Sequence, residues 1–269
     1  MKIYSCFCFF NEFNLLKIQL DELQDVVDIF VIIESRFTLS GKPRKLQLQD
    51  KLDQFKSDKY EIRYYTLDTY DLDKLKIPGH VEDMMFDQRE MFSLGLYDAE
   101  DDDIILSSDI DEIPRNIVVE QLYKINNPVV LNLQFFYYYF NTPIVAPKKP
   151  QDYTCNNAIL VHRYRDLKNV TNKSQRLIKD YLPRVKNAGW HFSHLNTPNE
   201  LREKYLATSH IEYSYFGLDP YEKIKARRES LTDPYERPGV VMQPIMLDSF
   251  LPNYVIQHQN ELKDYIYKI

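Results

Sequence analysis

The chain has 269 residues, of which 44% are hydrophobic and 28% are charged, and this balance excludes disordered and fibrous proteins. The formal net charge of −6 argues against a broad phosphate-binding surface, so we expect no nucleic-acid partner. No apolar run reaches the roughly 18 residues that span a bilayer, so we expect no transmembrane segment. Three cysteines without a C-x-x-C pair predict a reducing, cytoplasmic location rather than a disulfide framework.

The first third of the chain predicts a β-α-β unit. Residues 2–10 have a strand pattern, residues 14–24 a helical pattern, and residues 26–34 an almost continuously apolar strand pattern. Strands that are buried on both faces, as in parallel sheets, lack alternation. The same order continues more weakly, with a strand near 60–66, a helix at 82–95, a strand at 103–108, a helix at 115–124 and a strand at 128–139. We therefore predict an α/β fold with a mostly parallel central sheet flanked by helices.

The second half is less regular. Three prolines within residues 143–150 mark a long connection after the aromatic strand. Further elements are expected as a strand at 157–163 and helices at 198–208, 219–229 and 252–267. Nothing resembles a flexible linker, so we expect residues 1–269 to pack as one domain.

Two aspartates, Asp109 and Asp111, come almost directly after the apolar run 104–106. On an extended backbone residues i and i+2 point to the same side, about 6.6 Å apart, and two carboxylates so placed can bind one divalent cation. Pro114 is expected to end the strand pairing. The alternative is an ordinary acidic loop, because the run 98–103 is also acidic.

Three further places carry candidate chemistry. Gly189–Ser193 holds the only tryptophan, Trp190, beside His191, whose imidazole is a reasonable additional ligand for Mn²⁺; the alternative is a structural histidine. Glu212 ends a predicted helix and offers a general base, or it is a solvated helix terminus. Arg89 offers a fork to phosphate oxygens, or it is a surface residue. Neither G-x-x-x-x-G-K-[ST] nor G-x-G-x-x-G occurs, which argues against P-loop kinases and dinucleotide oxidoreductases.

Several blocks together resemble glycosyltransferase family 17. They lie in the order of the family and span roughly residues 6–213. The blocks are 10–16, 22–23, 25–28, 30–35, Thr38, 41–43, 88–89, 108–114, 188–193 and 209–212.

The resemblance implies a GT-A-like nucleotide-sugar fold that performs inverting transfer from a UDP-sugar, with GlcNAc as the expected sugar and Mn²⁺ or Mg²⁺ as the metal. The donor side is expected in residues 1–125 and the acceptor side, for a glycan or another hydroxyl compound, in residues 126–269. The chain begins almost directly at its first strand, so it resembles a soluble bacterial or viral type of enzyme.

Carried over onto this sequence, the resemblance makes Asp109 and Asp111 ligands of the metal and the diphosphate, with His191 completing the metal shell. The remaining donor-site residues implied are Asn11, Glu12, Glu34, Arg89 and Trp190. Inversion needs a base opposite the leaving group, for which Glu212 is the first candidate and Glu112 the second. Two alternatives stay open: a carbohydrate-binding protein without turnover, and a metal-dependent hydrolase of sugar nucleotides.

Overall fold

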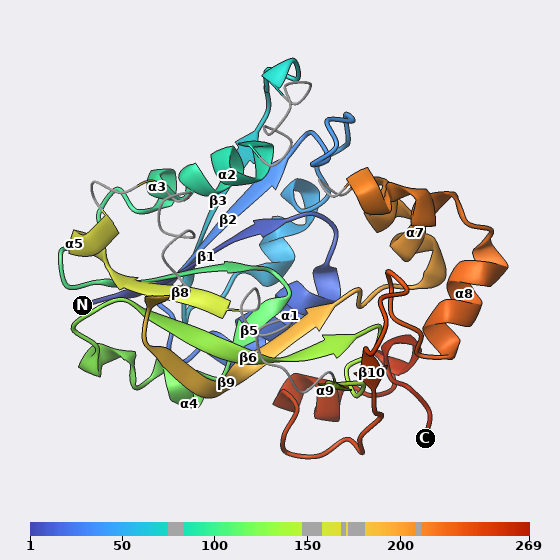
Figure 1. Ribbon diagram of the computed structural model, residues 1–269. Coiled ribbons are helices and arrows are strands. Elements are labelled where there is room, and N and C mark those ends of the chain that lie inside the picture. Colours follow the sequence, from blue (N-terminus) through green and yellow to red (C-terminus); the bar gives the residue numbers. More distant parts are fainter. Residues whose placement is uncertain (75–82, 147–157, 168–170, 172–180, 208–210) are drawn as a thin grey trace.

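The computed structural model describes residues 1–74, 83–146, 158–167, 171, 181–207 and 211–269. One eight-stranded sheet forms its centre, in the order β3-β2-β1-β4-β8-β6-β9-β5 (Figure 1). The strands are β1 (Ile3–Phe9), β2 (Ile29–Ser35), β3 (Glu61–Leu67), β4 (Ile104–Asp109), β5 (Glu112–Pro114), β6 (Val129–Tyr137), β8 (Ala158–Arg163) and β9 (Arg184–Ser193). Short strands β7 (Ile144–Ala146) and β10 (Val241–Met242) pair separately.

The two halves of the large sheet differ in strand direction. β3, β2, β1 and β4 are all parallel, whereas β8 runs antiparallel to both β4 and β6, and β5 runs antiparallel to β9. β6 and β9 are parallel to each other. Four of the seven strand pairs are therefore parallel, which confirms the predicted α/β class with a mostly parallel sheet and is consistent with a GT-A-like fold.

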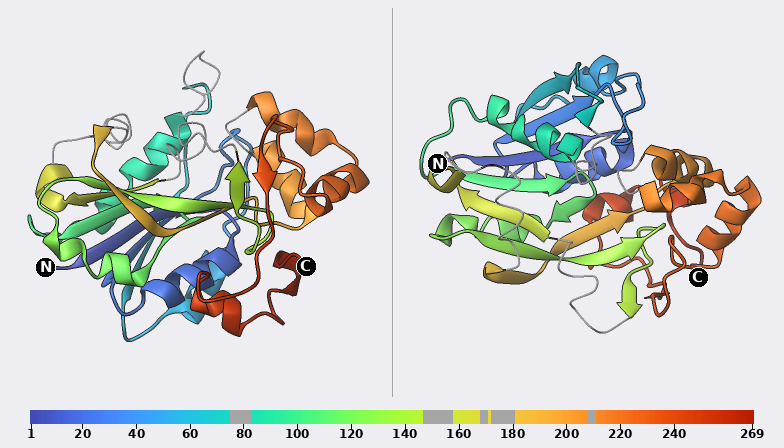
Figure 2. Two further views of the ribbon diagram at one scale, coloured as in Figure 1. Left: turned by 60° about the horizontal axis from the view of Figure 1, so that its bottom comes forward. Right: turned by 45° about the horizontal axis from the view of Figure 1, so that its top comes forward.

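Helices cover both faces of this sheet (Figure 2). On one face lie α1 and α9, and on the other lie α2 and α3, while α7 and α8 pack beyond the end of β6 and β9. The helices are α1 (Phe13–Leu23), α2 (Asp83–Glu90), α3 (Phe92–Gly95), α4 (Asn116–Val119), α5 (Tyr164–Leu167), α7 (Pro198–Ala207), α8 (Tyr221–Glu229) and α9 (Asn253–Gln257). The 3-10 helices are η1 (Gln49–Phe55), η3 (Leu122–Lys124), η6 (Ile211–Leu218) and η7 (Lys263–Tyr265).

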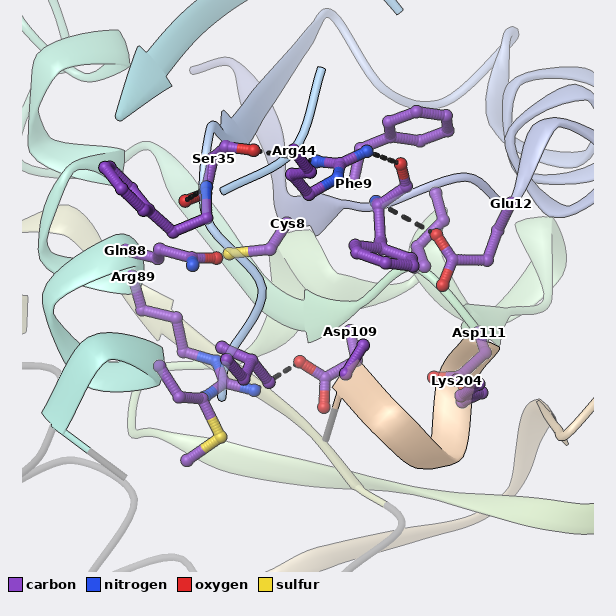
Figure 3. Close-up of a pocket in the computed structure, with 16 residues that line it drawn as sticks. Cys8, Phe9, Glu12, Ser35, Arg44, Gln88, Arg89, Asp109, Asp111 and Lys204 are labelled. Atoms are coloured by element: carbon purple, nitrogen blue, oxygen red, sulfur yellow. Dashed lines mark hydrogen bonds and ion pairs between the residues drawn. The ribbon is translucent and has the colours of Figure 1, made fainter. Parts of the chain in front are cut away.

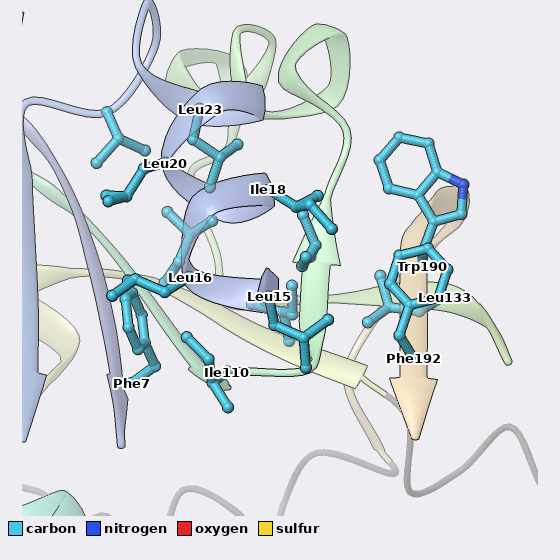
Figure 4. Close-up of a cluster of buried hydrophobic side chains, with 14 of the residues drawn as sticks. Phe7, Leu15, Leu16, Ile18, Leu20, Leu23, Ile110, Leu133, Trp190 and Phe192 are labelled. Atoms are coloured by element: carbon cyan, nitrogen blue, oxygen red, sulfur yellow. The ribbon is translucent and has the colours of Figure 1, made fainter. Parts of the chain in front are cut away.

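The core explains why the first strands lack alternation. In β2, Phe30 and Ile32 pack toward α1, whereas Val31 and Ile33 pack toward α3, and all four are fully buried. Successive side chains of a strand point to opposite faces, so a strand with helices on both sides needs apolar residues at every position. Figure 4 shows the α1 side of this core, where Leu16 and Leu20 pack toward the sheet.

Three local predictions are wrong. The expected helix 82–95 is two helices, α2 and α3, which meet at Met91. The expected helix 252–267 is only α9 and the 3-10 turn η7, with turns between them. The expected helix 115–124 is the short helix α4 and the 3-10 helix η3. Pro114, by contrast, is the last residue of β5 and pairs with Gly189, so the strand pairing ends at this proline as expected. A proline fits there since β5 is an edge strand, where its missing N–H removes no inner hydrogen bond.

Within the described ranges, no helix is both long enough and apolar enough to cross a lipid bilayer.

Candidate functional site

A hollow of about 240 Å³ lies beyond the carboxyl ends of β1, β2 and β4 (Figure 3). The pairing register brings these ends together, because Cys8 of β1 lies opposite both Ile33 of β2 and Asp109 of β4. The strand order reverses between β1 and β4, since β2 and β3 extend to one side and β4 lies on the other. Ligands of open α/β sheets bind at such a switch point. The hollow is therefore the candidate site on topological grounds alone.

Asp109 and Asp111 both line this hollow, although not as the sequence pattern predicted. Asp109 is the last residue of β4, and Ile110 and Asp111 form the turn that leads into β5. The two aspartates therefore do not lie on one extended strand. Glu112 holds the turn, because its Oε2 accepts the Asp109 N–H at 2.9 Å. The turn, and not an extended strand, is what brings both residues to one hollow.

The strand β9 places His191 beside this turn. Glu112 pairs with His191 across β5 and β9, and the Phe192 N–H donates to the Asp111 carbonyl at 2.8 Å. The imidazole Nε2 lies 3.5 Å from Asp111 Oδ2. Gly189 allows this close pairing, because a Cβ there would lie 2.1 Å from the Ile113 carbonyl oxygen.

The charges around Asp111 favour its ionised form. Burial acts to raise the pKa of this carboxyl, but His191 and Lys204 outweigh it and hold the pKa below the usual value. Burial acts to lower the pKa of His191, and the Asp111 carboxylate outweighs that effect and raises it. Lys204 Nζ, from α7, lies 3.8 Å from Asp111 Oδ2. The surroundings of this pair therefore favour an ionised carboxylate and a protonated imidazole, with a lysine close by.

Arg89 of α2 lines the hollow next to Asp109. Its side chain is 3% exposed and its Nη2 donates to Asp109 Oδ1. The other two nitrogens, Nε and Nη1, have no hydrogen-bond acceptor in the described part of the chain. A buried guanidinium with unmet donors is costly, and phosphate and carboxylate oxygens are the groups that satisfy it best.

The residues at the turn fit a divalent cation as part of a larger complex. No group of three His, Cys, Asp or Glu side chains in the described ranges forms a ready-made metal cluster. Mg²⁺ and related ions are commonly held by one or two carboxylates together with substrate phosphates rather than by a protein cage. Asp109 and Asp111 supply two hard oxygen ligands in one hollow, and His191 lies next to them.

The loop after β1 contributes Glu12 but not Asn11. Glu12 lines the hollow, and its Oε2 accepts the N–H groups of Phe10 and Asn11 at 3.0 and 2.9 Å. Asn11 is only partly buried and is not among the residues that line the hollow. The prediction that both residues line the crevice therefore holds for the glutamate alone.

Glu34 does not line the crevice, contrary to expectation. Its side chain is fully buried and accepts four hydrogen bonds, from Arg44, the Gln47 and Leu48 N–H groups and the Tyr64 hydroxyl. The carboxylate is thus turned into the loop after β2. It holds Arg44, which does line the hollow and whose Nη1 donates to the Ser35 carbonyl at 2.8 Å.

Trp190 is also placed away from the hollow. Its side chain is 2% exposed, lies in the core on the α1 side, and donates from Nε1 to the Phe250 carbonyl at 2.8 Å (Figure 4). Neighbouring residues of a strand point to opposite faces, so His191 at the site requires Trp190 in the core.

The two candidate bases, Glu112 and Glu212, lie in different places relative to the hollow. Glu112 is 1% exposed, holds the turn through Asp109, and is not among the residues that line the hollow. Glu212 belongs to η6, shortly after the α7 segment that borders the hollow, and its side chain lies outside the described residues.

Sequence reasoning missed Lys204 and Arg44. Arg44 comes directly after the block 41–43 that resembles the family, so the resemblance could have pointed to this residue. Lys204 lies on a charged helix with no distinguishing pattern. It reaches the site because the loop after β2 contacts the end of α7, where the Ser40 hydroxyl donates to the Leu206 carbonyl at 3.1 Å.

Comparison of the sequence with known proteins identifies the family. Beta-1,4-mannosyl-glycoprotein 4-beta-N-acetylglucosaminyltransferase of Homo sapiens is 34% identical to the chain over 113 residues, and the Rattus norvegicus and Mus musculus proteins of that name are 34% and 33% identical over the same length. The match covers 39% of this chain but only 20% of each relative. A sequence model of glycosyltransferase family 17 matches residues 1–224, which include the turn at Asp109–Asp111 and Lys204. The chain therefore belongs to glycosyltransferase family 17.

Proposed function

We propose that this protein is a metal-dependent, inverting glycosyltransferase that moves N-acetylglucosamine from a UDP-sugar to a hydroxyl group of a glycan. Family membership supports glycosyl transfer, and the activity for which the relatives are named supports the sugar. The single observation that carries the proposal is the hollow at the β1–β4 switch point, which Asp109, Asp111 and Arg89 line together.

Each of these residues has a role in the proposed reaction. Asp109 and Asp111 would hold a divalent cation, with His191 next to Asp111. When bound, the cation neutralises charge on the diphosphate of the donor. Arg89, which lines the hollow, donates to phosphate oxygens. Glu12 and Arg44 border the same hollow on the side of β1 and β2.

In the proposed transfer step, the configuration at the anomeric carbon of the sugar is inverted. The acceptor hydroxyl oxygen forms a bond to the anomeric carbon of the sugar from the side opposite the phosphate. The bond between that carbon and the phosphate oxygen breaks, and UDP leaves with the electron pair. We assign Glu212 as the base that takes the hydroxyl proton. Because Glu112 is buried and holds the turn, it serves in this proposal to position Asp109.

Calorimetric titration with UDP, with and without Mn²⁺, tests the donor site. We expect binding that requires the metal and that the Asp111→Asn variant loses. The anomeric configuration of the product from UDP-GlcNAc, read by NMR, then tests inversion. UDP binding that ignores both metal and substitution would indicate a sugar-binding protein, and donor consumption without a transfer product would indicate a hydrolase; either result contradicts the proposal.

A further inference from the structure

Lys204 is a cation at the site that neither the family resemblance nor the sequence pattern assigns. It reaches the hollow from α7, and its Nζ lies 3.8 Å from Asp111 Oδ2 while its side chain remains 32% exposed. Figure 3 shows Asp111 and Lys204 together on one side of the hollow, and Asp109 with Arg89 nearer its other side. Each aspartate of the turn therefore has its own cationic partner.

Acidic and basic side chains line the hollow together. Three carboxylates line it, from Glu12, Asp109 and Asp111, and three cations line it, from Arg44, Arg89 and Lys204. Of these cations, Arg44 already pairs with buried Glu34, at 3.1 Å. Arg89 and Lys204 are thus the lining cations that face the two aspartates, and His191 lies beside Asp111 as well.

A nucleotide sugar and a divalent cation add no net charge to the hollow only when they bind together. Each phosphate of the donor carries one negative charge, so donor and cation cancel. A cation alone would bring positive charge against Arg89 and Lys204, and a diphosphate alone would meet both carboxylates. Among the residues that the structure describes, Nε and Nη1 of Arg89 have no hydrogen-bond acceptor while Nη2 donates to Asp109, so Asp109 alone does not satisfy this guanidinium.

We infer that Lys204 and Arg89 exchange partners during donor binding, passing from the two aspartates to the diphosphate oxygens as a cation takes the carboxylates. The inference rests on the proposed function. It makes Lys204 a residue with two opposite effects: it opposes binding of the cation alone, and it strengthens binding of the nucleotide to the cation-loaded protein. Metal and nucleotide then raise each other's affinity, and Lys204 carries part of that coupling.

The test uses the full chain and the probes Mn²⁺ and UDP. For Lys204→Met we expect Mn²⁺ to bind the nucleotide-free protein about threefold to tenfold more tightly, because a nearby like charge is gone. We expect UDP to bind the Mn²⁺-saturated variant about tenfold more weakly, because a charge-assisted hydrogen bond is lost. Calorimetry measures both affinities, and Mn²⁺ electron paramagnetic resonance measures the first independently.

Two further variants complete the design. Lys204→Arg keeps the charge and should stay within about threefold of the parent protein in both titrations. Lys223→Met removes a helical lysine that also pairs with one aspartate, Asp219 at 3.0 Å, but lies outside the hollow, and it should change neither affinity.

The pattern of results separates the two proposals. Opposite changes in Lys204→Met, rescued by Lys204→Arg, support the exchange. If the parent protein binds UDP only with Mn²⁺ but Lys204→Met changes neither affinity, or weakens both, the exchange is wrong and the proposed function stands. If the parent protein binds no UDP in the presence of Mn²⁺, both are wrong.

Discussion

The acids at the carboxyl ends of β2 and β4 differ sharply, although both strands are apolar and belong to the parallel half of the sheet. Glu34, near the carboxyl end of β2, is fully buried and accepts four hydrogen bonds. Asp109 and Asp111, at the end of β4, line the hollow and face cations across it. One end of the sheet thus carries a carboxylate that is buried among hydrogen-bond donors and a pair of carboxylates that lines a hollow.

The difference comes from the segment that continues each strand. After β2 the chain returns over the strand end and brings the N–H groups of Gln47 and Leu48 to the Glu34 carboxylate at 2.6 and 3.1 Å. After β4 the chain turns at once, and the N–H of Asp109 is taken by Glu112. Position at a strand end therefore identifies candidate site residues. The number of nearby hydrogen-bond donors then decides which carboxylate has a structural role.

The largest expected effect is a loss of stability when the structural carboxylate, Glu34, is replaced. Glu34→Gln should lower the free energy of unfolding by about 3–5 kcal/mol, because it leaves the Arg44 guanidinium buried without its counter-ion. Denaturant unfolding measured by circular dichroism gives the loss. A decrease below about 1 kcal/mol would contradict a structural role for this glutamate.

Asp111→Asn tests the functional side. Loss of one metal and diphosphate ligand should reduce transfer on the order of 100-fold. The free energy of unfolding should fall less than in Glu34→Gln, because His191 can lose its proton when the carboxylate is gone whereas Arg44 cannot. Initial rates with UDP-GlcNAc and a denaturation curve give the two values. Asp102→Asn, in the exposed acidic run before β4, is the matched control and should change neither. Equal losses in both variants would favour the acidic-loop interpretation.

Asp98 is an intermediate case, structural but partly exposed. It receives both Nη groups of buried Arg63 at 2.6 and 3.0 Å, together with Lys2 and Tyr4. Asp98→Asn should lower the free energy of unfolding by about 1–2 kcal/mol, because a hydrogen-bonded charge pair loses one partner at a site that solvent partly screens.

The pH dependence of that loss gives an independent measurement. The hydrogen bonds from Arg63 are the largest cause that lowers the pKa of Asp98 below its usual value. A lowered folded-state pKa means that the stabilisation is complete above the ordinary aspartate pKa of about 4 and is lost as pH falls from there toward the folded-state pKa. The difference between parent and Asp98→Asn should therefore shrink below about pH 4; a constant difference would contradict the ion pair as its source.

The smallest effect is expected for an acid that is neither buried nor at the hollow. Glu261 pairs with Lys17 on the surface, and both side chains are more than a third exposed. Glu261→Gln should change the free energy of unfolding by less than about 0.5 kcal/mol, since solvent screens such pairs. A larger loss in the same denaturation assay would show that burial does not determine how much each acidic residue contributes to stability.

The sequence predicted the first elements well because their signals are local. The apolar runs of β1 and β2 and the helical spacing of α1 each report burial directly, and the structure places them within a few residues of expectation. The predicted helix 252–267 failed because Leu251, Val255 and Leu262 have helical spacing but reach the core from separate turns. Asn141 holds the end of this tail, accepting the Tyr267 N–H at 2.8 Å, a contact with no local signal.

For the candidate site, the sequence by itself determined the acids of the turn, the family and the α/β class, because these depend on residue type, order and local spacing. Only the tertiary structure decided that Glu34 and Trp190 turn inward, that β8 enters the sheet antiparallel, and that Lys204 reaches Asp111 from a helix nearly a hundred residues later. Those outcomes depend on strand register and on which distant segments supply hydrogen bonds and charge. Contacts of that kind are made between segments, so no single segment encodes them.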